Sequence, residues 1–238
     1  MTSRKPIVDI FSQVIEQQRE LGLGELRLDR DAVATLLPPE SSKKPSRDSA
    51  ASTKALADYC EQICNCTKCR LHEGRNKFVF GVGNPAADVM FVGEGPGHDE
   101  DMKGEPFVGR AGQLLDKILA AIKFDRKQIY IANIVKCRPP NNRDPQPDEM
   151  SECLPYLKQQ IEIINPRFIC CLGRVAAQAL LGVTTPLGKM RGRFMDFEGR
   201  KLMVTYHPAA LLRFPQYKRD TWEDVQMLRK AYDEWLTS

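Results

Sequence analysis

The sequence predicts an α/β fold with a central sheet of four parallel strands and helices on both faces. Short apolar runs rich in β-branched residues alternate with longer stretches of helical spacing, which is typical of βαβ units. The chain has 238 residues, 42% of them hydrophobic, which is enough for one large α/β domain or two small ones. Glycine, proline and polar residues follow several apolar runs directly, as expected where strands end at a ligand site.

The N-terminal region comes first and differs from the rest. Residues 7–21 place apolar side chains at helical spacing, and two glycines follow them. Residues 38–53 are rich in proline, serine and charge, which is typical of a flexible linker. We therefore expect an N-terminal extension over residues 1–52, made of a helix and a linker, and a compact domain over residues 53–238.

The compact domain is expected to begin with a helix over residues 53–63, after which strands and helices alternate. The expected strands are residues 88–92, 129–135, 168–172 and 202–206. The expected helices are residues 111–122, 148–164, 175–181 and 217–235. In such a sheet the parallel strands end at one edge. The segments GEGPG, NIVKCRPP and HPAALLR, which end or follow three of the strands, are therefore expected to meet there.

Composition and charge narrow the possible functions without choosing one. The formal net charge is +4 and the pI is about 8.6, which permits nucleic-acid binding but does not require it. There is no run of 18 apolar residues, so no membrane span is expected. The first residues lack the apolar core of a signal peptide, and we expect a cytoplasmic protein.

Eight cysteines are many for a chain expected in a reducing compartment, so metal binding or catalysis is a better interpretation than disulfides. Cys66 and Cys69 form a C-x-x-C pair, and Cys137 and Cys153 lie further along the chain. Four thiolates can hold a zinc ion or an iron–sulfur cluster, and the wide second spacing favours a cluster slightly. On spacing alone, Cys64 is an alternative to Cys66.

Four segments carry a resemblance to a known family: GEGPG at 93–97, EPFVGRAGQLLDKIL at 105–119, YIANIVKCRPPNNRDPQPDE at 130–149 and HPAALLR at 207–213. With the cysteines, they make the chain from about residue 54 onwards resemble the family 4 uracil-DNA glycosylases, the iron–sulfur members of their superfamily. The resemblance implies a three-layer α/β/α sandwich. It also implies an enzyme that flips uracil out of DNA and hydrolyses its N-glycosidic bond, which initiates base excision repair. The expected partner is uracil-containing DNA, and we expect a monomer.

The resemblance further implies a [4Fe-4S] cluster held by Cys66, Cys69, Cys137 and Cys153. It favours Cys66 over Cys64 because the letters R-L follow the C-x-x-C pair, as they do in the family. These ligands come from separated segments of the chain. We therefore expect the cluster to have a structural role.

The GEGPG segment is expected to form part of the base pocket. Its glycines Gly93 and Gly95 let the backbone approach an extruded nucleotide. Gly95 stands where related glycosylases carry a water-activating aspartate, so this chain lacks that base. Glu94 is expected to help orient the water, and Glu100 is a second candidate.

The remaining site residues follow from the other segments. Phe107 is expected to stack on uracil, and Asn133 to read its O4 and N3–H. His207 is expected to donate a hydrogen bond to O2 as negative charge develops there. Leu211 is the expected wedge in the base stack, and Arg213 the expected phosphate contact. Further candidates for the phosphate path are Lys136, Arg138, Arg143, Lys189, Arg191 and Arg193.

Three other interpretations of the sequence differ from this one. The first is a catalytically silent, cluster-bearing DNA-binding module of the same fold. The second is a related glycosylase that binds uracil-DNA covalently through a histidine in an inserted K-R-R-I-H loop, and the sequence has no such insertion. The third is a nucleotide-binding protein, but GEGPG lacks the Lys-Ser/Thr of a P-loop and the spacing of a dinucleotide fingerprint.

Overall fold

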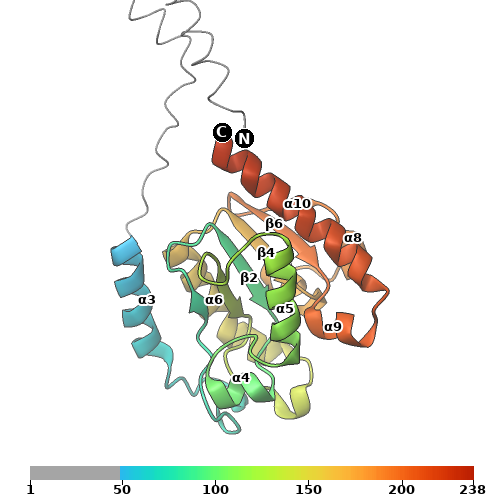
Figure 1. Cartoon of the computed structure of the whole chain (residues 1–238). Helices are drawn as coiled ribbons and strands as arrows, with labels where there is room; N and C mark the ends of the chain where they lie inside the picture. Colours follow the sequence, from blue (N-terminus) through green and yellow to red (C-terminus); the bar gives the residue numbers. More distant parts are fainter. Residues whose placement is uncertain (1–48) are drawn as a thin grey trace, which may run out of the picture. The chain divides into compact units, whose positions relative to one another are not determined.

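The computed structural model describes residues 49–238 (Figure 1). The expected helix over residues 7–21 and most of the predicted linker lie outside the described residues. The first helix, α3, runs from Ser49 to Ile63 and so begins four residues earlier than predicted. Its first turn contains two alanines, which are strong helix formers, and the Thr53 hydroxyl donates to the carbonyl of Ser49.

Within the described residues the sheet has six strands in the order β1-β3-β2-β4-β6-β5. Their bounds are β1 (Val82–Gly83), β2 (Val89–Gly93), β3 (Tyr130–Asn133), β4 (Phe168–Leu172), β5 (Phe194–Phe197) and β6 (Arg200–Thr205). The pairs β3-β2, β2-β4 and β4-β6 are parallel, whereas β1 and β5 pair antiparallel at the two edges. The predicted sheet of four strands was therefore incomplete. The missed strands are short and partly exposed, so they carry no continuous apolar run.

The other helices alternate with the strands. Their bounds are α4 (His98–Lys103), α5 (Arg110–Ala121), α6 (Pro147–Ile164), α7 (Arg174–Leu181), α8 (Leu187–Met190), α9 (Pro208–Arg213) and α10 (Tyr217–Thr237), with 3₁₀ turns η1 (Arg70–His72) and η2 (Pro140–Asn142). The four predicted strands and the predicted α5, α6, α7 and α10 are confirmed, with ends shifted by two residues at most. The helices α4, α8 and α9 were missed because none is long enough to show a helical period.

Both faces of the sheet are buried, and successive strand residues face two separate cores. Met90 and Val92 of β2 pack in the core that α3, α6 and α7 cover. Val89 and Phe91 pack in the core that α5 and α10 cover. Figure 1 shows α5 in front of the strands and α6 behind them. Burial on both faces explains why the strands are apolar throughout instead of alternating.

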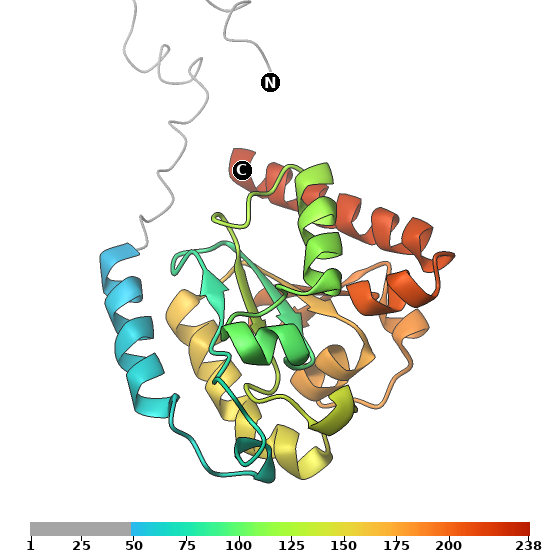
Figure 2. The same cartoon turned by 60° about the horizontal axis from the view of Figure 1, so that its bottom comes forward.

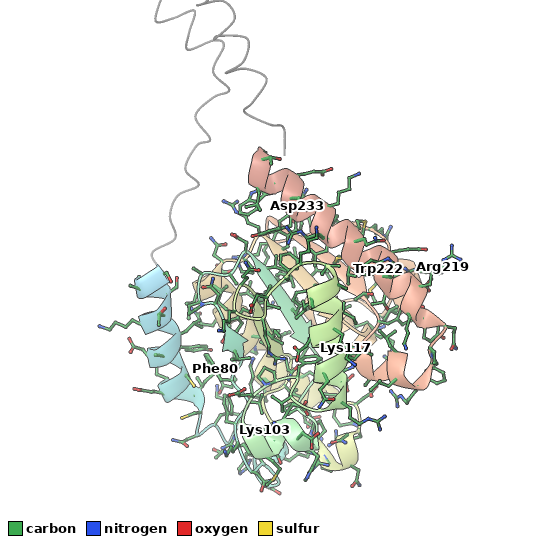
Figure 3. The ribbon with its side chains drawn as sticks, in the orientation of Figure 1. Phe80, Lys103, Lys117, Arg219, Trp222 and Asp233 are labelled. Atoms are coloured by element: carbon green, nitrogen blue, oxygen red, sulfur yellow. The ribbon has the colours of Figure 1, made fainter. Side chains whose placement is uncertain are left out.

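The carboxyl ends of the four parallel strands lie at one edge of the sheet, which Figure 2 turns forward together with α4 and α9. The register places Gly93 of β2 beside Asn133 of β3. At one flank of the domain, Phe80 lies beside α3, with its ring centroid 6.1 Å from that of Tyr59 (Figure 3). None of the helices in residues 49–238 is long and apolar enough to cross a membrane.

Candidate functional site

A pocket of about 460 Å³ lies at the carboxyl edge of the sheet. Phe107, Asn133 and His207 all line it. They come from the loop before α5, from the end of β3 and from the turn after β6. The structure thus brings together the three side chains that were expected to surround one ring, while their individual roles stay predictions.

The GEGPG segment packs tightly against β3 at the floor of this pocket. A methyl group at Gly93 would overlap the side-chain oxygen of Asn133 and lie 2.7 Å from Phe107 Cζ. A methyl group at Gly95 would lie 2.7 Å from Val135 Cγ2. Both contacts are closer than real Cβ atoms tolerate. The two glycines are therefore required by the packing of the loop itself, in addition to any approach of a ligand.

Glu94 lines the pocket and is half-buried. Burial raises the pKa of its carboxyl group to about 7, and the nearby charge of Asp144 acts in the same direction. The cations Arg174 and Arg213 act in the opposite direction on this pKa. The Glu94 side chain therefore changes its charge near neutral pH, which is the range where a group that orients or activates water works best.

Phe107 forms one wall of the pocket in an uncommon backbone conformation. Its φ angle is 55°, in the left-handed region that residues other than glycine seldom adopt. Arg126 Nη1 donates to the Phe107 carbonyl oxygen at 3.0 Å, and a Cβ at Gly112 would overlap that same carbonyl. The Phe107 ring centroid lies 5.4 Å from that of His207. The surrounding protein thus holds the backbone at Phe107 and places its ring beside that of His207.

Glu100, the second candidate for orienting water, is committed to backbone groups. Its Oε1 accepts hydrogen bonds from the amides of Val108 and Gly109 at 3.0 and 2.9 Å, and its Oε2 accepts one from Gly97 at 3.1 Å. The side chain therefore holds the GEGPG loop against the segment that carries Phe107. The signal in the sequence was its place as the third residue of α4, where a glutamate commonly binds the N-cap amide.

Asn133 has a buried polar atom with no protein partner. Its side chain is 2% exposed, and within residues 49–238 no donor reaches its Oδ1. A buried acceptor without a hydrogen bond is unfavourable by roughly 1–3 kcal/mol. Such an atom on the wall of a pocket indicates a place for a ligand that brings an N–H group.

His207 is the N-cap residue of α9, and this role fixes its tautomer. Its Nδ1 accepts a hydrogen bond from the Ala209 amide at 3.1 Å, so in the neutral ring the proton resides on Nε2. Burial lowers the pKa of His207 to about 4, and the charge of Arg213 contributes in the same direction. At neutral pH the pocket is therefore lined by an uncharged imidazole with an N–H donor.

The two leucines of α9 differ from the prediction. Leu211, the expected wedge, is 1% exposed and packs inside the domain, whereas Leu212 is 42% exposed. The assignment of the wedge to Leu211 is therefore corrected, because a side chain inside the fold does not reach a base stack. Arg213 is exposed and lines the pocket, as a phosphate contact would require.

Two of the basic candidates for the phosphate path are also corrected. Lys136 is fully buried, and its Nζ donates to the Phe80 carbonyl at 3.0 Å. Arg191 forms ion pairs with Asp224, which is itself 1% exposed. Lys136 thus belongs to the interior of the domain, whereas Arg191, with its side chain 18% exposed, is bound by a buried carboxylate. Conversely, the sequence did not single out Arg110 and Asp144, which line the pocket.

Four cysteines line a second, much smaller cavity. They are Cys66, Cys69, Cys137 and Cys153. Three of their sulfurs receive hydrogen bonds: Tyr156 donates its hydroxyl to Cys66 at 3.1 Å, Arg75 its guanidinium to Cys137 at 3.3 Å, and Lys136 its amide to Cys153 at 3.2 Å. Such donors stabilise thiolate charge, so the set suits a ligand shell.

The other four cysteines are placed differently. Cys170 and Cys171 are buried within β4, and Cys60 and Cys64 are absent from the lining of the small cavity. All eight cysteines have free thiols, and no three His, Cys, Asp or Glu side chains in the described part of the chain are arranged to hold a single metal ion. Four cysteines from three separate parts of the sequence line one cavity, and a shared metal ligand would account for this arrangement.

Known proteins match most of the chain that the structure describes. The profile of the uracil DNA glycosylase superfamily matches residues 80–226. The type-4 uracil-DNA glycosylase of Archaeoglobus fulgidus is 45% identical over 183 residues, which are 74% of this chain and 92% of that protein. The type-4 enzyme of Saccharolobus solfataricus is 43% identical over 72% of this chain and 83% of its own length. The type-4 enzyme of Thermotoga maritima is 45% identical over 70% and 88%.

Proposed function

The chain belongs to the uracil-DNA glycosylase superfamily, and from this premise we propose that it removes uracil from DNA by hydrolysing the bond between the base and deoxyribose. The observation that carries the proposal is the unpartnered Asn133 oxygen in a pocket shared with Phe107 and His207. A catalytically silent DNA-binding module would have no need of such an acceptor. That alternative is therefore the weaker one.

The mechanism assigns one task to each pocket residue. The enzyme flips the nucleotide out of the stack, and uracil lies against the Phe107 ring. Asn133 Oδ1 accepts from the uracil N3–H, and the amide group donates to O4. As the glycosidic bond breaks, negative charge develops on uracil O2, and the neutral His207 stabilises it through Nε2–H. Glu94 orients the water that adds to the sugar.

We propose that the glycosylase domain covers residues 53–238 as a three-layer α/β/α sandwich, preceded by an N-terminal extension over residues 1–52. The first helix of the described residues, α3, begins at Ser49 and so crosses this boundary by four residues. We also propose that the protein acts as a monomer in the cytoplasm.

We propose that Cys66, Cys69, Cys137 and Cys153 hold a [4Fe-4S] cluster. These four cysteines come from the segment after α3, the segment after β3 and helix α6, so a bound cluster would tie these three parts together. The purified protein should be brown and absorb at about 400 nm, with about four irons per chain. A colourless protein with one zinc per chain would contradict the cluster while leaving the pocket chemistry intact.

The proposed activity is tested by incubating the purified protein with an oligonucleotide that contains one uracil. We expect free uracil and an abasic strand that alkali cleaves at that position. Thymine at the same position in a matched oligonucleotide should remain in place. A persistent protein–DNA adduct, or binding without release of the base, would contradict the proposal of a hydrolase.

The pH dependence of excision should follow the ionisation of Glu94. Its pKa of about 7 means that the carboxylate fraction falls as the pH drops below 7, so kcat/KM should decrease by about tenfold per pH unit there. The pKa of His207, about 4, leaves the imidazole neutral over this range. Glu94→Gln should be slower at high pH and should lose the dependence. A profile that stays flat in the unaltered enzyme would contradict the role of Glu94.

Leu212 is the proposed replacement for the corrected wedge. Leu212→Ala should lower excision from duplex DNA by about tenfold, because the apolar side chain no longer fills the gap that base flipping opens. Excision from single strands should change little. The control is Leu211→Ala, which should lower the free energy of unfolding by roughly 2–5 kcal/mol because that side chain is buried. Equal losses on both substrates for Leu212→Ala would count against a wedge.

A further inference from the structure

A buried carboxylate lies between the cysteine-lined cavity and the pocket. Glu149, in the first turn of α6, has a side chain that is 0% exposed. Arg143 binds it in a bidentate arrangement, with nitrogen–oxygen distances of 2.8 and 2.6 Å. Arg70 Nε lies 3.1 Å from Oε1, and the Gln146 amide donates to Oε2 at 2.7 Å. Glu149 thus joins a guanidinium and a backbone amide of the loop before α6 to a second guanidinium, Arg70, from a distant part of the chain.

The two arginines belong to different sites. Arg143 lies on the segment 138–146, which supplies Pro139, Asn142, Arg143 and Asp144 to the wall of the pocket. Arg70 directly follows Cys69, one of the cysteines around the small cavity. Arg70 also forms an ion pair with Asp148 at 2.7 Å, which holds it against the same turn of α6.

The segment 138–146 is a turn with little regular secondary structure. It contains two consecutive residues in the left-handed region, Asn141 and Asn142, with φ angles of 54° and 53°. Asparagine adopts this region more readily than other residues except glycine, so the position of the turn is set by its contacts with the rest of the domain. Beyond Glu149, its contacts with the rest of the domain include an exposed pair between Asp144 and Arg174 and a hydrogen-bond contact between Arg138 and His98. Of these interactions, the one with the Glu149 carboxylate is buried.

We propose that Glu149 is a positioning residue that fixes the pocket wall 138–146 through Arg143 and couples it, through Arg70, to the turn that carries Cys69. A capping role alone requires only the bond to the Gln146 amide. It does not account for a second guanidinium partner, Arg70, which lies far from Glu149 in the chain. The inference rests on the proposed function where it concerns catalysis, whereas the coupling itself concerns the protein alone.

The first experiment is hydrogen exchange on the full chain, followed by mass spectrometry of peptides from segment 138–146. Glu149→Gln keeps the size and the capping acceptor of the side chain but removes its charge. We expect exchange in 138–146 to accelerate by about tenfold. Arg70→Ala should give a smaller acceleration in the same peptides. Glu162→Gln is the matched control, because Glu162 lies on the same helix with an arginine partner, Arg200, away from the pocket.

The second experiment is a double-mutant cycle on excision kinetics. Glu149→Gln should raise KM for a uracil oligonucleotide by about tenfold with little change in kcat. The double variant Glu149→Gln/Arg143→Ala should have the same KM as Arg143→Ala alone, because both substitutions remove the same ion pair between Arg143 and Glu149. The absorbance at about 400 nm per chain should stay unchanged, which separates loss of position from loss of a cluster.

The outcomes divide cleanly. Exchange in 138–146 that matches the Glu162→Gln control in both Glu149→Gln and Arg70→Ala overturns the proposal, as do additive effects in the cycle. If Glu149→Gln does not fold, Arg70→Ala decides alone, since its side chain is 57% exposed and its removal leaves the interior intact. If the unaltered protein releases no uracil, the proposed function fails, and the exchange data still decide the coupling.

Discussion

Replacing Asn133 with aspartate should reduce kcat/KM for uracil excision by about 10⁴-fold, because a site built on hydrogen bonds to one base rejects a mismatched pattern that strongly. The amide offers uracil both an acceptor and a donor, whereas an ionised carboxylate offers acceptors alone. Uracil O4 would then face a second oxygen in a buried site. The measurement is single-turnover release of uracil from a labelled oligonucleotide.

Two controls separate recognition from folding in this variant. Asn84→Asp makes the same chemical change in the turn beside β1, where the side-chain oxygen accepts from the Ala86 amide and an aspartate can do the same. It should leave excision unchanged. The melting temperature of Asn133→Asp and its binding to an abasic oligonucleotide report whether the fold and the DNA surface persist. Excision at the unaltered rate by Asn133→Asp would refute the assigned role of this residue.

His207→Ala should lower the single-turnover rate by about 10²–10³-fold, the usual loss when one donor to a developing oxyanion is removed. Binding to uracil-containing DNA should persist, because the phosphate contacts are elsewhere. His207 also caps α9, so the alanine variant removes two interactions at once.

His207→Asn separates the two roles of this residue. Asparagine is among the best N-cap residues, so this variant should restore the stability of α9 without restoring a donor at the position of Nε2. We expect its melting temperature to return towards that of the unaltered protein while its rate stays low. Recovery of the rate together with the stability would mean that His207 acts through the helix and does not contact uracil.

The sequence predicted the centre of the fold well because the central strands have an unambiguous signal. Strands buried on both faces are apolar throughout, and β4 was predicted with its observed ends. The edge strands β1 and β5 have no such run. The meeting of Asn133 and His207 was predictable for a related reason, since each follows or ends a parallel strand at its carboxyl end. The place of Phe107 at the same site came from the family resemblance alone.

The features that the sequence did not predict depend on tertiary packing. Whether Leu211 or Leu212 faces outwards is decided by the rotation of a six-residue helix, which its own sequence does not fix. Lys136 was expected at the surface because lysine seldom lies inside a protein, yet here a carbonyl oxygen and Gln160 accept from its ammonium group. Glu149 and its partner Arg143 lie in the same segment of the resemblance, but Arg70 is far away in the chain, so this pairing has no signal in the sequence.

The unpartnered Oδ1 of Asn133 implies a trade-off between the stability of the fold and uracil excision. An apolar side chain of similar size at this position would remove an unsatisfied acceptor, and it should increase the free energy of unfolding by roughly 1–3 kcal/mol. A selection for thermal stability alone would therefore favour variants that no longer recognise uracil. For any variant selected for heat resistance, uracil excision therefore has to be measured together with the melting temperature.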